Sequence, residues 1–489
     1  MRKECKLTTG CVFYMLFISY FAWIFVFLNY TVESIKDTTT YKFDITHQSK
    51  TSAFDRRRQH HIQFKHNEPV DTLTTPKSSR FRDLVNDSEP GDALIPSVIK
   101  WRWSPTNDMY SEEMLKGSEQ CHGKFIGYQQ NFAMLKDIIV NPKHGSGRHG
   151  GENISHVLNQ PEENEYYQFK RGFFNLECPE VFRYVFNSNS HIRNWFEALA
   201  FKWNSKEFTV DESISKWTIA VQRYEYANLY HTMTDLYNAF LIAKIFKMEP
   251  GSINILWIDG HPGGALDDTW KVLFGDVIRS GDIRKPVNFE RMVWGIMGYD
   301  SPLNKHKLKK VHYLEEFRHF FLSRHGIPVN KNILNCENLK ILFIWRHNYV
   351  AHPRNPSGVV SRKIQNEDDL LSTARHVLPG HNISGIQIDK LSMENQLNLI
   401  ANTDILIGMH GAGLTHALFL PKHAGLIEFY PKYWSAANVH FKSMARWRNI
   451  SYTNWINTDR MRELPDNLTI IDLDTFRQLL KQMKHKLCP

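Results

Sequence analysis

A glycine-rich stretch from Asp404 to His416 combines residue types that can bind phosphate. Its apolar beginning predicts a strand, the crowded small residues predict a turn, and Leu414 to Leu420 can continue as a helix. Gly411 and Gly413 would let the backbone approach a ligand closely, and free N–H groups at a helix start favour phosphate. The spacing fits neither a P-loop nor G-x-G-x-x-G, and an ordinary tight turn is the alternative. We expect contacts with the phosphorylated ligand from His410, Gly411, Ala412, Gly413 and Thr415.

Two charged residues at the ends of two other predicted strands extend this phosphate site. Arg346 closes a buried-looking strand at its carboxyl end, where a guanidinium can pair bidentately with phosphate. Glu428, at the end of another strand, can accept hydrogen bonds from both hydroxyls of a ribose, and a structural ion pair is the alternative. Arg362 and Lys363 are interpreted as solubilising charges. Arg346, Glu428 and the glycine-rich stretch together predict a nucleotide-diphosphate pocket.

A second chemistry is possible at the start of the helix predicted for residues 228–246. Asn228, His231 and Asp235 share one face of this helix, apart from its apolar stripe. A histidine beside a carboxylate can act as a general base with an orienting partner, so either His231 or Asp235 could take a proton. A solvated face with a capping asparagine is the alternative. We expect these three residues to be catalytic and to face the phosphate pocket.

No metal site is predicted. The sequence has no Cys/His metal spacing, and its D-x-D, Asp472-Leu473-Asp474, precedes a predicted helix that Asp474 would cap. A departing diphosphate can be stabilised by an arginine and helix dipoles instead. We therefore expect no required cofactor and no essential divalent metal ion.

The elements that would carry these residues alternate between strand and helix from Trp217 onward. Strands are predicted at 217–224, 253–258, 292–296, 339–345, 383–388, the start of the glycine-rich stretch and 425–429; helices are predicted at 228–246, 266–274, 313–325, 367–377, 393–401 and then up to residue 486. Alternation implies parallel sheets with helices on both faces, and two successive sets imply two Rossmann-like domains. Residues 141–165 are predicted to form a surface loop.

Length and composition fit a folded protein with an N-terminal membrane helix. The chain has 489 residues, 42% of them hydrophobic, and a formal charge of +9. Its basic residues are dispersed without a nucleic-acid-binding motif, so no nucleic acid partner is expected. Residues 11–30 carry no charge and are long enough to cross a bilayer, with the N-terminus cytosolic; a cleaved signal peptide is the alternative. The predicted layout is a cytosolic tail (1–10), a transmembrane signal anchor (11–30), a flexible stem (31–97), and two Rossmann-like domains (98–332 and 333–489), the second of which carries the predicted nucleotide-diphosphate pocket.

Cysteines and glycosylation sequons agree with a lumenal location for the folded part. The four cysteines after the predicted anchor can form two disulfides in any of three pairings. They are Cys121, Cys178, Cys336 and Cys488. Sequons for N-glycosylation occur at Asn86, Asn153, Asn382, Asn449 and Asn467.

Several of these stretches together resemble family-61 glycosyltransferases, whose shared signature is a Gly-x-His-Gly-Ala-Gly loop with an upstream Asn-x-x-His helix start. The matching residues are Arg223 to Thr232, Asp259 to His261, Tyr349 to Arg354 and Gly408 to His416. The resemblance implies a GT-B fold, in which two Rossmann-like domains face a cleft, the first (98–332) for the acceptor and the second (333–489) for the UDP-sugar. It also implies a UDP-sugar donor, inversion at the anomeric carbon and a single-pass type II protein of the Golgi membrane. Acceptor contacts are expected from Glu225, Tyr226 and His261.

Within the family, the chain is most similar to the branch that adds β-1,2-linked xylose to N-glycans. That branch implies UDP-α-D-xylose as co-substrate and the 2-hydroxyl of the core β-mannose as acceptor. Met409 departs from the pattern of the branch and is expected to alter loop packing rather than chemistry. Two alternatives stay open: an O-linked N-acetylglucosaminyltransferase of the same family using UDP-GlcNAc, and a non-catalytic lumenal glycan-binding protein.

Overall fold

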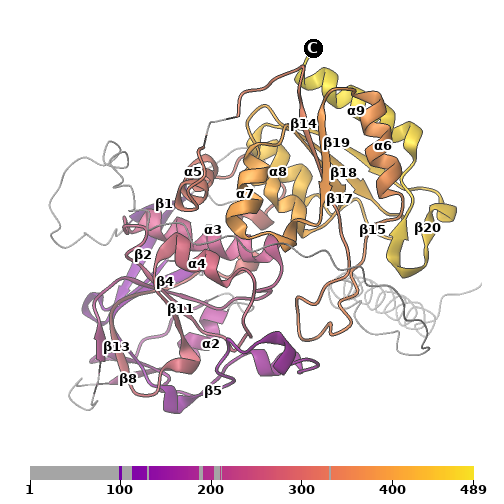
Figure 1. Ribbon diagram of the computed structural model, residues 1–489. Helices are drawn as coiled ribbons and strands as arrows, with labels where there is room; N and C mark the ends of the chain where they lie inside the picture. The colour runs from indigo at the N-terminus through magenta and orange to yellow at the C-terminus, as the bar shows by residue number, and fades with distance from the viewer. Residues whose placement is uncertain are drawn as a thin grey trace, which may run out of the picture. The chain divides into compact units, whose positions relative to one another are not determined.

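The computed structural model describes residues 98–101, 113–128, 131–186, 191–202, 210, 212–329 and 332–489. In these residues, the helices and strands gather around two main sheets (Figure 1). We call residues 98–329 the first lobe and residues 332–489 the second lobe. The predicted cytosolic tail, membrane helix and stem lie outside the described residues.

The sheet of the first lobe is mixed. Within the described residues it has eleven strands, eight of which follow the order β1-β2-β3-β4-β13-β10-β11-β12. Strands β10 (Thr218–Val221), β11 (Asn254–Trp257), β12 (Val277–Arg279) and β13 (Val287–Trp294) are parallel, whereas β4 (Phe132–Val140) pairs with β13 antiparallel. Every residue of β10 and β11 is buried, as expected for apolar strands covered on both faces.

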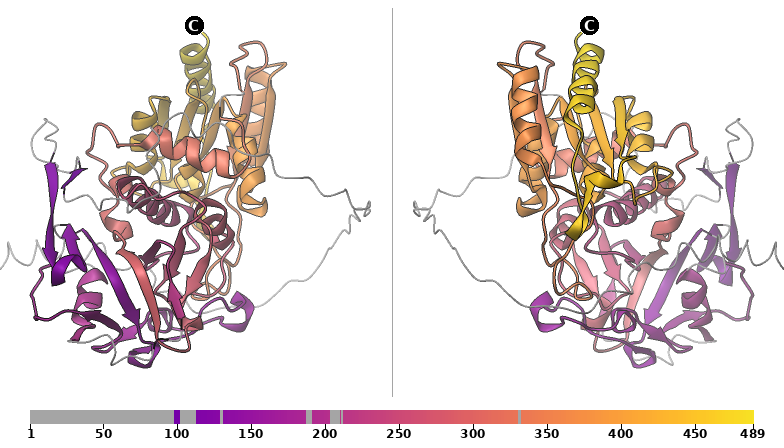
Figure 2. Two further views of the ribbon diagram at one scale, coloured as in Figure 1. Left: turned by 90° about the vertical axis from the view of Figure 1, so that its left-hand side faces the viewer. Right: turned by 90° about the vertical axis from the view of Figure 1, so that its right-hand side faces the viewer.

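Helix α3 of the first lobe lies between the two sheets (Figure 2). Thirteen of its 17 residues are buried, so its polar face is largely enclosed as well. The α-helices of this lobe are α2 (His191–Glu197), α3 (Leu229–Ile245), α4 (Asp267–Phe274) and α5 (Leu314–Arg324). The other described strands are β1 (Val98–Trp101), β2 (Glu113–Gln120), β3 (Phe125–Tyr128), β5 (Gly145–Ser146), β6 (Gln168–Phe169), β7 (Phe174–Glu177), β8 (Leu199–Lys202) and β9 (Glu212–Ile214).

The main sheet of the second lobe is parallel in its described strands, with the order β16-β14-β17-β18-β19. The chain goes from β14 to β16 on one side and then to β17 on the other, which creates a switch point between β14 and β17. Ligands of such sheets bind at the carboxyl ends of the strands beside the switch point. The strands are β14 (Lys340–Ile344), β16 (Asn382–Ile386), β17 (Ile405–Met409), β18 (Gly425–Tyr430) and β19 (Ser451–Ile456). A small additional sheet contains β15 (Lys363–Ile364), β20 (Glu463–Leu464) and β21 (Leu468–Thr469).

Helices cover both faces of this parallel sheet (Figure 1). Ile341 and Phe343 of β14 pack in one core with α6 (Glu367–Val377) and α9 (Leu473–Leu487). The alternate residues Leu342 and Ile344 pack in another core that continues into the first lobe. The α-helices of the second lobe that contribute to this core are α7 (Met393–Ala401) and α8 (His440–Arg448).

Two disulfides select one of the three possible pairings. Cys121–Cys178 joins the ends of β2 and β7, and Cys336–Cys488 joins the segment before β14 to the end of α9. Each cross-link restricts the unfolded chain, which stabilises the fold by about 2–4 kcal/mol.

The predicted fold class is wrong for the first lobe. The first lobe is not a doubly wound Rossmann-like sheet, because the antiparallel strands β1 to β4 extend its parallel part. Those strands come from aromatic-rich sequence before Trp217 that shows no clear period. The fold class also included a transmembrane helix, but no helix in the described residues is long and apolar enough to span a membrane, and segment 11–30 lies outside them. The structure is an α/β protein with mixed sheets.

Candidate active site

Arg346 follows β14 at the switch point of the parallel sheet. Its Nε donates to the backbone oxygen of Ser361 at 3.1 Å. Gly411, just after β17, lies against this guanidinium, since a Cβ on Gly411 would be 2.1 Å from Nη1. The φ of Gly411 is 170°, which any residue can adopt, so this position needs glycine for space. The glycine turn therefore makes room for Arg346.

Arg362 is held beside Arg346 with a strained backbone. Its φ is 62°, and its backbone N–H donates to the Tyr433 hydroxyl at 2.8 Å. The guanidinium carbon lies 3.8 Å from the centroid of the Trp434 ring, and Nε is buried without a hydrogen-bond partner among the described residues. Strain that fixes a cation in this way is typical of functional sites. The interpretation of Arg362 as a solubilising charge is wrong.

Arg346 and Arg362 form a pair of cations with no ion-pair partner among the described residues, although the more distant charge of Asp389 acts on the pKa of Arg346. In the described part of the chain, no carboxylate lies within ion-pair distance of either guanidinium. Burial, followed by the neighbouring Arg346, lowers the pKa of Arg362 to about 9. Burial also lowers the pKa of Arg346. A bound anion would relieve this repulsion, and two planar guanidinium groups suit a diphosphate.

Glu428 orients His410 instead of facing a ribose. Its Oε1 is 2.6 Å from Nδ1 of His410, and its Oε2 accepts the Tyr452 hydroxyl at 2.7 Å. Glu428 is 0% exposed, so the predicted direct contact with a nucleotide is not available. Burial raises the pKa of Glu428 to about 7. Burial, followed by the charges of Arg362 and Arg346, lowers the pKa of His410 to about 3.

The rest of the glycine turn is more closed than expected. The helix predicted after the turn, at Leu414 to Leu420, is a 3-10 helix, η11 (Ala412–Leu418). Thr415 is 0% exposed and therefore does not face a ligand. A Cβ on Gly413 would lie 3.1 Å from Cγ2 of Ile344, which shows how closely the turn packs on β14. Ala412 and Gly413 stay partly exposed.

His231 is a half-buried side chain at the start of α3. Neither of its ring nitrogens has a hydrogen-bond partner among the described residues. Burial lowers its pKa to about 4, so the imidazole is neutral near pH 7 and can accept a proton. The exposed rings of Tyr224 and Tyr299 lie 6.3 and 5.9 Å from the His231 ring.

His440, which begins α8, connects the two parts of the predicted site. Its ring is 5.6 Å from that of His410 and 4.7 Å from that of Tyr230, the residue before His231. The charges of His410 and His231 both act on the pKa of His440, which burial lowers to about 3. The structure thus brings the helix start at His231 and the turn at His410 to one place. His440 belongs to none of the sequence motifs and was not predicted from the sequence.

Asn228 and Asp235 have structural partners. Asn228 caps α3, because its Oδ1 accepts the N–H of Tyr230 at 2.9 Å. Asp235 is 4% exposed and takes a backbone hydrogen bond from Tyr224. Burial raises the pKa of Asp235 well above its ordinary value, against the opposing charge of Arg223. The two side chains lie on the same helix face as His231, but unlike His231 they are already hydrogen-bonded.

Two of the three predicted acceptor contacts are buried. Both nitrogens of the His261 ring are engaged, Nδ1 with Glu165 at 2.8 Å and Nε2 with the backbone oxygen of Arg223 at 2.9 Å. Tyr226 is 1% exposed and stacks on this ring at 4.6 Å. Glu225 alone of the three is partly exposed, and burial raises its pKa. His261 and Tyr226 therefore support the local backbone and do not touch an acceptor.

Tyr224 and Tyr299 provide the open aromatic surface that Tyr226 does not. Their side chains are 40% and 41% exposed, and their rings lie 4.7 Å apart. They flank His231, and exposed tyrosine rings can stack on a sugar while their hydroxyls bond to it. The signal in the sequence was only an aromatic residue after each of two strands.

The loop after β14 joins the lobes. Arg354 forms ion pairs with Glu162 and, at 3.7 Å, with Glu225. The oxygen of Pro353 accepts the N–H of Asn159 at 2.9 Å. Part of the segment predicted as a surface loop is thus an inter-lobe contact, and Arg354 is engaged there and not at the arginine pair.

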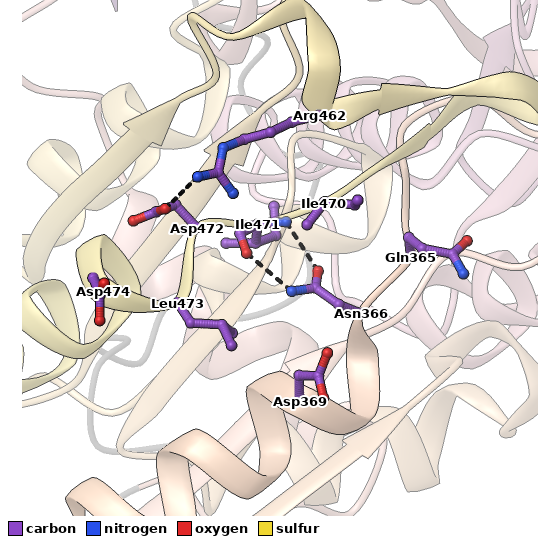
Figure 3. Close-up of a pocket in the computed structure, with 9 residues that line it drawn as sticks. All are labelled: Gln365, Asn366, Asp369, Arg462, Ile470, Ile471, Asp472, Leu473 and Asp474. Carbon is purple, nitrogen blue, oxygen red and sulfur yellow. Dashed lines mark hydrogen bonds and ion pairs between the residues drawn. The ribbon is translucent and has the colours of Figure 1, made fainter.

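A cavity beside α6 and α9 contains the D-x-D sequence (Figure 3). Asp472 caps α9 by accepting the N–H of Thr475 at 2.8 Å and pairs with Arg462 at 2.5 Å. Asn366 exchanges two hydrogen bonds with the backbone of Ile471. The sequence is structural, as predicted, although its first aspartate is the cap. No group of three metal-binding side chains occurs among the described residues, and the expectation that no metal is essential stays a prediction.

The predicted glycosylation sites stay predictions. Four of the asparagines are exposed in the structure, whereas Asn86 lies outside the described residues. The exposed ones are Asn153, Asn382, Asn449 and Asn467.

Part of the chain is similar to known glycosyltransferases. Residues 226–427 match the family model Glycosyltransferase 61. A beta-1,2-xylosyltransferase of Arabidopsis thaliana is 25% identical over 413 residues, which cover 70% of this chain and 74% of that protein. A beta-1,2-xylosyltransferase of Oryza sativa subsp. japonica is 25% identical over 342 residues, or 62% and 63% of the two chains. An EGF domain-specific O-linked N-acetylglucosamine transferase of Drosophila melanogaster is 28% identical over 247 residues, or 47% and 44%.

Proposed function

We propose that the protein is an inverting β-1,2-xylosyltransferase, since residues 226–427 match the family model Glycosyltransferase 61. It transfers xylose from UDP-α-D-xylose to the 2-hydroxyl of the core β-mannose of N-glycans. The xylosyltransferase relatives support this donor, since their similarity extends over more of the chain than that of the N-acetylglucosamine transferase. The two disulfides support an oxidising compartment, and we propose the Golgi lumen, where N-glycans are processed.

The observation that most supports a nucleotide-sugar reaction is the pair of Arg346 and Arg362, which has no ion-pair partner among the described residues. Arg346 lies at the switch point of the parallel sheet. In the proposed reaction, the acceptor hydroxyl attacks the anomeric carbon from the face opposite UDP. The new C–O bond forms as the bond to the β-phosphate oxygen breaks, which inverts the anomeric centre. Arg346 and Arg362 hold the departing diphosphate and stabilise its developing charge.

We assign the acceptor proton to His231. Its ring is neutral and partly exposed, and the open rings of Tyr224 and Tyr299 beside it can hold a sugar. Asp235 is less suited because it is buried and already accepts a hydrogen bond from the backbone of Tyr224. A neutral imidazole within reach of a hydroxyl can accept its proton as the bond forms.

The full-length protein, incubated with UDP-xylose and an N-glycan with an exposed core mannose, should add one pentose that β-xylosidase removes. The reaction should proceed in EDTA, because the arginines replace a metal ion in this proposal. A glycan that gains no pentose would sink the proposed activity, and activity only after adding a divalent metal would sink the metal-free part of it.

The second candidate is an O-linked N-acetylglucosaminyltransferase. The EGF domain-specific relative favours it, and an arginine pair can bind the diphosphate of any UDP-sugar. Transfer of N-acetylhexosamine from UDP-GlcNAc to a folded EGF domain, with no transfer from UDP-xylose to the glycan, would select this function.

A further inference from the structure

Glu428 acts on a ligand only through His410. Its two carboxyl oxygens are occupied by Nδ1 of His410 at 2.6 Å and by the Tyr452 hydroxyl at 2.7 Å, and the side chain of Tyr430 also hydrogen-bonds this carboxyl. Resting on the proposed nucleotide-sugar reaction, we infer that Glu428 and Tyr452 are positioning residues. They fix His410 so that its Nε2 keeps a hydrogen and donates it to the diphosphate, and UDP binding therefore requires a proton on the Glu428–His410 pair.

The free nitrogen of His410 belongs to the surroundings of the arginine pair. Nδ1 is taken by Glu428, whereas Nε2 has no hydrogen-bond partner among the described residues. The charges of Arg362 and Arg346 both act on the ring, and Arg346 lies against Gly411, the next residue in the chain. A diphosphate held by both arginines would thus lie beside this imidazole.

The proton on the pair decides what Nε2 offers to an anion. When the pair carries it, on the carboxyl of Glu428 or on an imidazolium, Nε2 has a hydrogen to donate. When the pair has lost it, the remaining ring hydrogen sits on Nδ1 and is donated to the Glu428 carboxylate. Nε2 then presents a lone pair, which repels phosphate oxygens. Burial raises the pKa of Glu428 to about 7, so the loss occurs within an accessible pH range.

The groups around the pair do not titrate in that range. Burial lowers the pKa of His440 to about 3, and burial raises the pKa values of Tyr430 and Tyr452. The two arginines stay cationic. The titratable or charged groups that surround the pair are Arg346, Arg362, Tyr430, His440 and Tyr452.

Calorimetric titration of the full-length protein with UDP, between about pH 6 and about pH 8, tests this inference. With one required proton, the affinity should fall about tenfold over that interval. In Glu428→Gln, the amide N–H₂ can donate permanently to Nδ1 while the amide oxygen still accepts from Tyr452. The variant should therefore bind UDP with nearly the same affinity throughout, apart from the titration of UDP itself.

Tyr452→Phe gives a second test that keeps the carboxyl. The Tyr452 hydroxyl stabilises the carboxylate and lowers the pKa of Glu428, so its loss should move the fall in UDP affinity to higher pH. Parallel pH profiles for the wild-type protein and Glu428→Gln, or a midpoint unchanged in Tyr452→Phe, would overturn the inference.

The outcomes also separate this inference from the proposed function. UDP binding without the pH dependence contradicts the role of the pair and leaves a nucleotide-sugar enzyme intact. A wild-type protein that binds no UDP at any pH contradicts both.

Discussion

At the scale of single residues, the site is distinguished by cations without an ion-pair partner and by a histidine ring without a hydrogen bond. Among the described residues, no carboxylate forms an ion pair with Arg346 or Arg362, and neither ring nitrogen of His231 is hydrogen-bonded. Leaving such groups unpaired costs stability, which a protein recovers when the right ligand binds. The buried Glu165 and Asp259 show the contrast, since each already has a partner.

Removal of either arginine should weaken UDP binding. Arg346→Met and Arg362→Met each remove charge-assisted bonds to phosphate, at a cost of about 2 kcal/mol or roughly thirtyfold in Kd. The melting temperature without UDP should stay equal or rise, because one buried charge is relieved. Titration with UDP measures the first effect and thermal unfolding the second. The exposed Arg375 on α6 offers a matched control, and equal losses in Arg375→Met would contradict the assignment.

His231 and Asp235 should differ in their effects on turnover. His231→Ala removes the proposed proton acceptor, so kcat should fall by about a hundredfold or more while the Kd for UDP is kept. Asp235→Asn should leave much of kcat, because burial raises the pKa of Asp235 and a neutral amide resembles its protonated form. Initial rates and UDP titrations on both variants decide the matter. If Asp235→Asn loses turnover as completely as His231→Ala at an unchanged melting temperature, Asp235 shares the proton transfer.

At the scale of elements, the turn after β17 shapes the site by what it leaves out. Gly411 has an extended backbone, so its lack of a side chain serves the guanidinium of Arg346. The residues after it form a tight 3-10 helix that contacts α3 and α8, and its Gly413 lies close to Ile344 of β14. The element is thus a spacer between two strands as well as a possible source of backbone donors.

Gly411→Ala should reduce UDP affinity by displacing Arg346. The new Cβ would lie 2.1 Å from Nη1, a distance at which the guanidinium must move. A double-mutant cycle checks this cause: in an Arg346→Ala background, Gly411→Ala should have little further effect on the Kd for UDP. Additive losses in the double variant would show that Gly411 serves the ligand directly through its backbone.

Periodicity in the sequence predicted most elements between Trp217 and Tyr430, but not how side chains would be partnered. Helix α7 begins and ends where the apolar spacing placed it, at Met393 and Ala401. Strand β19 was included among helices, because its residues are mostly half-buried and give no strong alternation. That strand carries Tyr452, and without it the role of Glu428 could not be recognised. Arg362 was misread because its sequence neighbours look like a surface loop.

At the scale of the whole molecule, the two lobes depend on each other for the site. Helix α3 contributes His231, the second lobe contributes the arginine pair, and His440 lies next to both parts. The hydrophobic core is continuous across the lobes, and Arg448 of α8 pairs with Glu315 of α5. A reaction that needs donor and acceptor on opposite lobes therefore requires their relative position to be fixed.

The contact of Arg354 with the first lobe should affect the acceptor more than the donor. Arg354→Met removes its ion pairs with Glu162 and Glu225, and leaves both carboxylates partly buried without a counter-charge. We expect a melting temperature lower by several degrees and a raised KM for the glycan, while UDP affinity stays within about twofold because the arginine pair is untouched. The reversed pair, Arg354→Glu with Glu162→Arg, should restore part of the stability if the ion pair is the cause. A loss of UDP affinity in Arg354→Met as large as that in Arg346→Met would instead place Arg354 at the diphosphate.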